Sequence, residues 1–444
     1  MSRHKNLMAS WGNPKHVLAP MVDGSELAWR MFGRNHGVHL TYTPMIHSVM
    51  FLKDRKYRQS CLQFTKDDRP LIAQFCANAP ETFTEAAKAV EPYCDAIDLN
   101  LGCPQGIAKR GHYGAFLQDE WELLSKIIRH ASNNLTLPIT CKIRVFPDVE
   151  RTVQYARMLE GAGVSLLTVH GRTREMKGHL TGLADWSQIR RVKEAVSIPV
   201  IANGNIQYFD DVERCLSETN ADAVMSAEGH LHNPAIFSGL QPSVYDMCSE
   251  YLCLAEKYPT TLSIVRGHVF KILHHALNEH PEFRQTIGLS QYLKEIRLYI
   301  DRMRVVCADC KKNTSDELPH PHWICQPYER PKMIYSDAVA NVVSDAKDES
   351  LIRYALSEQR KLRRETKRNL KQVRRDQSTL GRSSCIHCNL NLKGNQCPVN
   401  ACRGCCWKLD PGRSNHCSVH QYAKKRRKDR LSPSSDVKHL SESE

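Results

Sequence analysis

The sequence predicts a (β/α)8 barrel. Eight short apolar runs recur between Val17 and Ala227, and each ends in a turn and precedes a helix-like segment. Near-continuous apolar strands that alternate with helices are typical of a parallel sheet covered by helices, and eight such units suit a barrel. The runs are VLAPM from 17, VHLTYTP from 38, LIAQFCA from 71, AIDLN from 96, ITCKIR from 139, LLTVHG from 166, IPVIANG from 198 and ADAVMSA from 221.

Helical spacing of apolar residues supports the same alternation in residues 81–90, 121–131, 150–161 and 186–196. A doubly wound α/β sheet is the alternative fold. It is weakened because no GxGxxG motif follows the first apolar run.

The 444-residue chain is long enough for several domains. We predict a barrel in residues 1–240, a small helical domain in 241–345, a basic helix-prone linker in 346–383, a Cys/His module in 384–422, and a basic and then disordered tail in 423–444. The stretches at 263–280 and 289–304 carry apolar residues at helical spacing, which favours the helical domain.

Charge is distributed unevenly along the chain. Residues 1–350 carry 40 Lys and Arg against 40 Asp and Glu, whereas residues 351–444 carry 22 against 8. A neutral body with a basic tail favours an appendage that binds a polyanion, and a solvated disordered tail is the alternative.

The chain shows no secretion signal and no run of about 18 apolar residues. Its 18 cysteines therefore point to a reducing compartment, where they serve as metal ligands, catalysts or core residues. We expect a cytoplasmic protein without a membrane partner. The run KKRRK at 424–428 also fits nuclear import or RNA binding.

The stretch from Asp95 to Gly114 is the most informative in the chain. Residues 96–101 alternate like a strand and are followed by Gly102, Pro104 and Gly106, so Cys103 should lie at the carboxyl end of a strand. A buried cysteine in a turn is the simpler alternative.

Polar or basic residues end several other strands, where a barrel carries its chemistry. Singly, each could be a satisfied core group or a surface cation, but together they favour one site. These strand-end residues are Pro20, Met21, Gln74, Asn100, Cys103, Lys142, Arg144, His170, Arg172, Asn203, Gly204, Asn205, Ala227, Glu228 and Gly229.

This set suits a cofactor with a phosphate group. The loops after the last two strands, at 203–205 and 227–229, occupy the usual phosphate position of the fold. Lys142 can face the anionic edge of a reduced flavin, and Gln74 can donate and accept at the same ring, which favours FMN over an adenine dinucleotide. A thiol that is mostly protonated at neutral pH would make Cys103 a proton donor.

Several motifs resemble the tRNA-dihydrouridine synthases, an FMN-dependent barrel family. They are APMVDGSE, IAQFCA, DLNLGCPQ with GHYGAFL, KIRV, VHGRTR, IANGNI and NPAIF, and together they span roughly residues 15–240. The chain looks most like the eukaryotic branch that acts on D-loop uridines of the 16/17 type. The resemblance implies hydride transfer from reduced FMN to uracil C6, protonation of C5 by Cys103, and NAD(P)H as reductant.

The resemblance also implies roles for individual residues. Flavin-contacting positions of the family match Pro20, Met21, Val22, Gln74, Lys142, His170, Asn203, Gly204 and Asn205. Positions where the family meets flavin or the flipped uridine match Asn100, Arg144 and Arg172. Glu228 departs from the Gly-Arg pair of many bacterial members, so we expect the backbone to contact phosphate there, with this side chain turned away. The family places an RNA-gripping helical domain after its barrel, which implies tRNA as the partner, and we expect a monomer.

Two cysteine clusters follow the barrel. Cys307-x2-Cys310, with His320, His322 and Cys325, could hold zinc, although a segment that simply covers the barrel is the simpler interpretation. The second cluster has few apolar residues to form a core, so we predict one or two structural zinc ions, with a redox-active CxxC as the alternative. Its ligands would come from Cys385, Cys388, Cys397, Cys402, Cys405, Cys406, Cys417 and His420.

We therefore expect a tRNA-dihydrouridine synthase that uses FMN. The alternatives are an FMN-dependent reductase of a small pyrimidine and a catalytically inactive RNA-binding or chaperone-like protein on the same scaffold.

Overall fold

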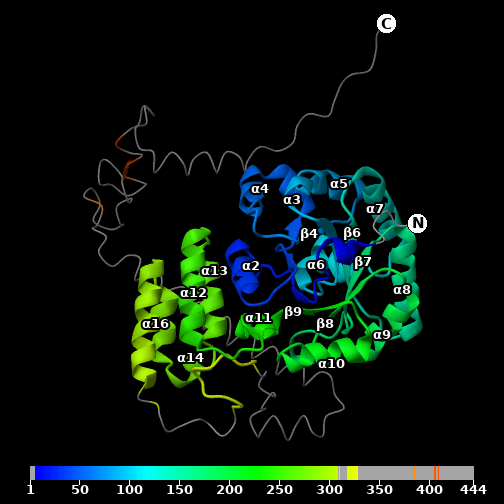
Figure 1. Cartoon of the computed structure of the whole chain (residues 1–444). Coiled ribbons are helices and arrows are strands. Elements are labelled where there is room, and N and C mark those ends of the chain that lie inside the picture. The colour runs from blue at the N-terminus through cyan, green and yellow to red at the C-terminus, as the bar shows by residue number, and fades with distance from the viewer. Residues whose placement is uncertain are drawn as a thin grey trace, which may run out of the picture. The chain divides into compact units, whose positions relative to one another are not determined.

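The computed structural model describes residues 6–308, 310, 318–328, 385, 405–406 and 409. The chain divides into two units, Met1–Arg330 and Pro331–Glu444. The first unit contains the barrel and a group of helices that follows it (Figure 1).

All eight predicted strands are present, and they form a closed parallel barrel. Going round the wall, the order is β1-β9-β8-β7-β6-β5-β4-β2. A parallel bridge between Val17 and Leu40 closes the ring, and β3 (Ile46–His47) pairs with the end of β4. The other strands are β1 (His16–Leu18), β2 (Thr41–Tyr42), β4 (Leu71–Cys76), β5 (Ala96–Leu101), β6 (Ile139–Arg144), β7 (Leu166–His170), β8 (Val200–Asn203) and β9 (Ala223–Ser226).

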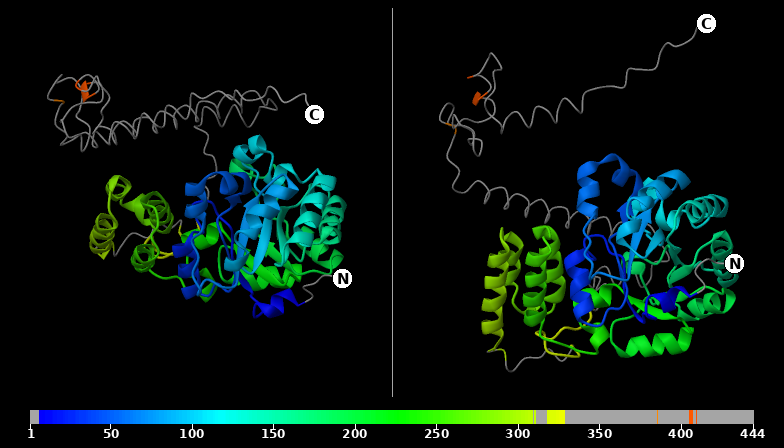
Figure 2. Two further views of the ribbon diagram at one scale, coloured as in Figure 1. Left: turned by 90° about the horizontal axis from the view of Figure 1, so that it is seen from above. Right: turned by 45° about the horizontal axis from the view of Figure 1, so that its top comes forward.

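Helices surround the strands, as the alternation predicted (Figure 2). The four segments with helical spacing are helical in the structure, as α5 (Pro80–Lys88), α7 (Trp121–Asn134), α8 (Val149–Ala162) and α9 (Trp186–Ala195). Asp148 and Asp185 cap the start of α8 and α9 by accepting backbone N–H groups. The other helices of the barrel are α1 (Leu7–Ser10), α2 (Leu27–Asn35), α3 (Ser48–Lys53), α4 (Arg55–Cys61), α6 (Gly106–Gly111), α10 (Asp210–Thr219) and α11 (Glu228–His232).

The barrel interior changes character along its axis. Side chains such as Val17, Ile72 and Leu166 fill one end and form an apolar cluster with Leu7 and Met8 of α1. Toward the carboxyl ends of the strands the buried side chains become polar and include those of Gln74, Asp98, Asn100, Thr140 and Thr168. Buried polar groups need hydrogen-bond partners, so this end of the barrel is where chemistry is expected.

In the described part of the chain five helices follow the barrel, and the first of them packs against α2. They are α12 (Val244–Lys257), α13 (Leu262–Ile272), α14 (Ala276–Glu279), α15 (Glu282–Leu289) and α16 (Leu293–Ala308). Tyr251 of α12 and His268 of α13 each hydrogen-bond the carboxylate of Glu26, at 2.9 Å, just before α2. Trp29 of α2 stacks on His268 with the ring centroids 3.8 Å apart. A buried polar cluster therefore joins the helices to the barrel.

Among the described residues, no helix combines the length and the hydropathy that a membrane crossing requires.

Candidate active site

The strand register brings the predicted residues to one end of the barrel. Lys142 of β6 pairs with Asn100 of β5, Arg144 pairs with His170 of β7, and His170 in turn pairs with Asn203 of β8. Because these strands are parallel and in this register, the polar ends of β5 to β8 lie side by side along the mouth.

A hydrogen-bonded network holds Gln74 in place. Its Nε2 donates to Asp98 Oδ2 at 2.8 Å, and its Oε1 accepts from Asn100 Nδ2 at 2.8 Å. Thr140 Oγ1 also donates to Asp98, at 2.6 Å. An amide has two N–H donors and two lone pairs, so Gln74 keeps one donor and one acceptor for a ligand.

Asp98 was not singled out by the sequence analysis. Its carboxyl is fully buried, and burial raises its pKa to about 6 against the lowering effect of the hydrogen bonds from Thr140 and Gln74. The sequence did contain a sign that Asp98 belongs to the site. It lies two residues before Asn100 in β5, and residues two apart in a strand face the same side.

Cys103 lies on a tightly held turn after β5. Asn100 Oδ1 accepts the N–H groups of Gly102 and Cys103, at 3.2 and 3.0 Å. Gly114 packs against the turn with a φ of +67°, and a Cβ there would come within 2.8 Å of the Cys103 carbonyl oxygen. The thiol residue is half-buried beside Cys76 and Tyr113. The turn is therefore fixed by contacts that require Asn100 and Gly114.

Three cations converge near this turn. Lys142 Nζ donates to Asn203 Oδ1 at 2.9 Å, and burial followed by the charge of Arg144 lowers the Lys142 pKa to about 8. Arg144 is buried and donates to the Gly102 carbonyl oxygen at 2.9 Å, and burial followed by the charge of Arg172 lowers its pKa to about 10. Crowded, desolvated cations of this kind favour the binding of an anion.

His170 and Arg172 connect these cations to the loop after β8. Nη1 of Arg172 lies 2.9 Å from His170 Nε2, and Nη2 donates to Asn205 Oδ1 at 2.7 Å. Burial, with the nearby charges of Lys142, Arg144 and Arg172, lowers the pKa of His170 well below its usual value. His170 is therefore neutral at physiological pH, and its ring nitrogen accepts from Arg172.

A pocket of about 240 Å³ opens between these residues and the last two strands. Gly204 has a φ of +116° and lies so close to Ala184 that a Cβ would come within 2.6 Å of the alanine methyl group. A Cβ on Gly229 would collide with the Ile206 carbonyl oxygen. The lining includes Arg144, His170, Arg172, Asn203, Gly204, Asn205, Ala227, Glu228 and Gly229.

The two loops present backbone amides to this pocket. Within the described part of the chain, no hydrogen bond to another protein group outside the regular helices and strands starts from the backbone N–H groups of Gly204, Asn205, Ile206, Ala227 and Gly229. Unpaired amides beside basic side chains suit the oxygens of a phosphate group. Glu228 is exposed at the rim, and Pro20, Met21 and Val22 follow β1, with Val22 largely exposed.

The predicted zinc ligands near the C-terminus are only partly described. Cys385 and Cys406 are buried and Cys405 is half-buried. Cys388, Cys397, Cys402, Cys417 and His420 lie outside the described residues, so that site stays a prediction.

A closed parallel barrel with a desolvated cationic mouth and a pocket lined by backbone amides and basic side chains is typical of a (β/α)8-barrel enzyme that binds an anionic cofactor. The family model described as Dihydrouridine synthase (Dus) matches residues 17–316, and the chain belongs to this family. The family is flavin-dependent and takes its electrons from NADPH.

Relatives extend the similarity beyond the barrel. A protein of Mus musculus named tRNA-dihydrouridine(16/17) synthase [NAD(P)(+)]-like is 46% identical over 92% of this chain and 88% of its own length. The tRNA-dihydrouridine(16/17) synthase [NAD(P)(+)] of Schizosaccharomyces pombe is 41% identical over 72% of this chain and 89% of its own length. A human tRNA-dihydrouridine(20a/20b) synthase [NAD(P)+]-like protein is 37% identical, over 58% of this chain and 81% of its own length.

Proposed function

We propose that this chain reduces uridines of the 16/17 type in the tRNA D-loop to 5,6-dihydrouridine, with FMN as its flavin. The observation that carries the proposal is the 46% identity to a relative named for the 16/17 positions, because that similarity covers 92% of this chain. The similarity to the 20a/20b relative covers 58%.

The residues at the barrel mouth fit FMN. The backbone amides of residues 204–206, Ala227 and Gly229, with Arg172 beside them, suit its phosphate. Lys142 supplies a cation at the depth of the barrel where Gln74 lies, and Gln74 has one donor and one acceptor left for a ligand. This combination of groups matches the polar edge of a flavin ring.

When bound, the reduced flavin supplies a hydride to C6 of the uracil ring. Cys103 then supplies the proton at C5, so that one hydride and one proton saturate the C5–C6 double bond. Negative charge develops on the uracil carbonyl oxygen, where Arg144 can stabilise it. Asn100 positions Cys103 through its two hydrogen bonds to the turn.

The target base must leave the folded loop to reach this mouth, since an enzyme cannot act on a base inside a stack. The rest of the tRNA then needs a basic surface to hold it. Residues 351–444 carry the excess of Lys and Arg, and we propose that they track the phosphate backbone as an arm. The cysteine module at 384–422 would be held by zinc.

The test is a reduction assay on unmodified tRNA with NADPH. Wild-type protein should be yellow and form dihydrouridine at the D-loop positions. Cys103→Ala should keep its flavin and still oxidise NADPH but lose product formation by roughly 10²- to 10⁴-fold, the range for a lost general acid. Cys253→Ala, an exposed cysteine of α12, serves as the matched control.

A colourless protein that binds tRNA would contradict the proposal and favour the inactive RNA-binding alternative. Equal turnover of Cys103→Ala and wild type would remove Cys103 from the reaction.

A further inference from the structure

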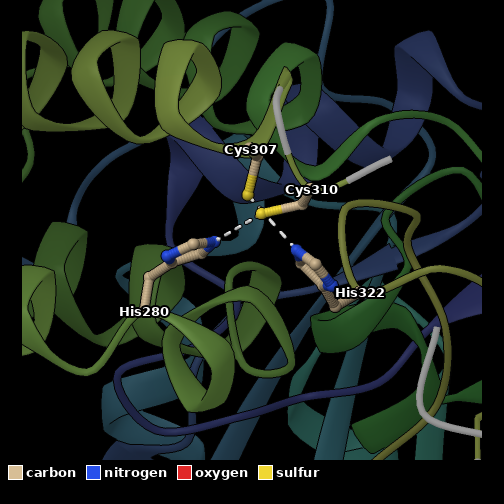
Figure 3. A group of neighbouring side chains, drawn as sticks. All are labelled: His280, Cys307, Cys310 and His322. Atoms are coloured by element: carbon tan, nitrogen blue, oxygen red, sulfur yellow. Dashed lines mark hydrogen bonds between the residues drawn. The ribbon is translucent and has the colours of Figure 1, made fainter. Parts of the chain in front are cut away.

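Two cysteines and two histidines meet at the end of the last described helix, far from the barrel mouth in sequence. His280, Cys307, Cys310 and His322 each offer one ligand atom, and all four atoms lie within 4.8 Å of one another. Figure 3 shows the four side chains pointing toward a common centre. We propose that these four residues bind one structural Zn²⁺ ion.

The distances suit a tetrahedral ion. The Cys307 Sγ and His322 Nε2 atoms lie 3.2 Å apart, and the Cys310 Sγ and His280 Nε2 atoms lie 3.4 Å apart. Around a tetrahedral zinc with usual bond lengths, neighbouring ligand atoms are separated by about 3.3 to 3.8 Å. Small movements of the side chains would therefore admit the ion.

The chemistry of the four ligands favours zinc over other common metals. Two thiolates and two imidazoles form an S2N2 set, which is typical of structural zinc, whereas magnesium and calcium prefer oxygen ligands. Cys307 and His322 are 6% and 3% exposed, so a bound ion would be shielded from water. A closed site with four protein ligands serves structure rather than catalysis.

The surroundings also orient the ligands. His280 presents Nε2 to the cluster, while its Nδ1 lies 3.5 Å from Oε1 of Glu282. A carboxylate on the second ring nitrogen is the usual partner of a metal-bound histidine and fixes the ring's orientation. Cys307 and Cys310 form a Cys-x2-Cys turn, in which the N–H of Cys310 donates to the Cys307 carbonyl oxygen at 3.1 Å.

The ligands come from three parts of the helical group. His280 lies at the junction of α14 and α15, Cys307 and Cys310 lie at the end of α16, and His322 lies in the segment 318–328. An ion would therefore join these parts at one point.

The segment 318–328 makes other contacts that a metal clamp would reinforce. The Val244 N–H donates to the Trp323 carbonyl oxygen, and the Cys325 N–H donates to that of Pro242, both at 2.9 Å. Tyr328 stacks on His232 of α11, with the ring centroids 5.7 Å apart. The segment thus connects α12 to α11, and a bound ion would fasten it to α16 as well.

The sequence had suggested His320 and Cys325 as further candidates here. Cys325 is fully buried in the main core, and the His320 backbone pairs with the Gln326 side chain. Neither belongs to the cluster, and His280 completes it instead.

The test is the zinc content of the full-length protein, measured by atomic spectrometry after dialysis. His280→Ala and Cys310→Ser should each lower it by one equivalent per chain relative to wild type. His320→Ala and Cys253→Ser are the matched controls and should leave it unchanged. Comparing variants with wild type removes the contribution of any zinc bound by the cysteine module at 384–422.

A second variant covers the case in which the first ones fail to fold. His280→Cys keeps a soft ligand and should retain the zinc equivalent, and after exchange into Co²⁺ its thiolate absorption should exceed that of wild type. Unchanged zinc content in His280→Ala and Cys310→Ser would overturn the proposal, as would identical Co²⁺ spectra of His280→Cys and wild type. A Cys307–Cys310 disulfide in untreated protein, found by mass spectrometry, would also overturn it. These readouts do not depend on the proposed reaction.

Discussion

The ammonium group of Lys142 donates a 2.9 Å hydrogen bond to Oδ1 of Asn203, which lies two strands away along the barrel wall. The contact connects the part of the mouth that holds Gln74 and Cys103 to the loop that begins the phosphate pocket. Lys142 therefore has two roles in the proposed site, as a cation and as a link between its halves.

Replacing Lys142 by Met should lower turnover on tRNA by roughly 10²- to 10³-fold, the range for a lost electrostatic stabiliser. The substitution removes the cation and leaves Asn203 without its donor. Lys126→Met, on the exposed face of α7, is the control and should behave as wild type. Initial rates of NADPH-dependent dihydrouridine formation give the comparison.

The affinity of the flavin-free protein for FMN should fall as the pH rises through about 8. The lowered Lys142 pKa means that the side chain is charged below about 8 and neutral above it, so the attraction for an anionic ligand is lost in that direction. Flavin fluorescence titrations between pH 6.5 and 9.5 measure the effect. If Lys142→Met shows the same pH dependence, another group is responsible.

Gly229→Ala should weaken FMN binding by roughly ten- to hundredfold. The added Cβ would collide with the Ile206 carbonyl oxygen. Overpacking of this kind typically costs about 1–3 kcal/mol, and the loops of the pocket would have to shift to relieve it. Gly161→Ala in α8 is the matched control, since a Cβ there meets nothing within 4 Å. It should leave flavin binding unchanged and stabilise the helix by about 0.5–1 kcal/mol. Equal flavin affinities of the two variants would argue against a phosphate at this loop.

Asp98→Asn should change how stability depends on pH. Burial raises the Asp98 pKa from 3.8 to about 6, so the native state holds this proton more tightly than the unfolded chain does. The contribution of this group to stability is therefore greatest below pH 3.8 and is lost as the pH rises through about 6. Relative to Asp98→Asn, wild type should lose up to about 3 kcal/mol of unfolding free energy between pH 4 and pH 7.

Urea unfolding of the flavin-free proteins at both pH values provides the measurement. The hydrogen bonds lost in Asp98→Asn cost the same free energy at both pH values. This cost therefore cancels when the stability difference between wild type and variant at pH 4 is compared with the difference at pH 7. A constant difference between the two proteins would show that Asp98 does not titrate in this range.

Glu26→Ala should destabilise the protein by about 1–3 kcal/mol for each of the two buried groups, Tyr251 and His268, that it leaves without a hydrogen-bond partner. Burial alone would raise the Glu26 pKa, but the charge and hydrogen bond of His268 and the hydrogen bond of Tyr251 outweigh it and lower the pKa. Glu250→Ala removes a more exposed pair with His36 and should cost about 0–1 kcal/mol. Comparable losses in both variants would mean that the buried cluster does not hold the helices to the barrel.

Deleting residues 351–444 should weaken tRNA binding and flatten its dependence on salt, because 22 Lys and Arg are removed with 8 Asp and Glu. Reduction of the bound flavin by NADPH should continue. Binding isotherms at several salt concentrations test this, and an unchanged slope would rule out the arm.

Local patterns predicted the barrel well. The eight apolar runs became the eight strands of the barrel wall, and the four helical segments became α5, α7, α8 and α9. Each of these elements depends on a periodicity that is visible within about ten residues of sequence. The strand-end rule then located Gln74, Lys142 and His170, because parallel strands bring their carboxyl ends together.

The partners of those side chains were harder to predict. Nothing in the neighbouring sequence indicates that Asp98 accepts a hydrogen bond from Gln74 or that Asn203 accepts one from Lys142. Nor does it indicate that Arg144 donates to the turn before Cys103. Each of these contacts joins different strands or loops, and its geometry depends on register and on side-chain packing across the barrel.

The sequence alone determined the order of strands and helices, the polar strand ends and the Cys-x2-Cys pair at 307 and 310, because each of these is a short-range pattern of residue types. Only the tertiary structure decided that His280 and His322 join that pair and that His320 and Cys325 do not. The physical reason is that a ligand set depends on which segments pack together. The packing of α15 beside α16, which brings His280 to the Cys-x2-Cys pair, is a long-range outcome that no local periodicity encodes.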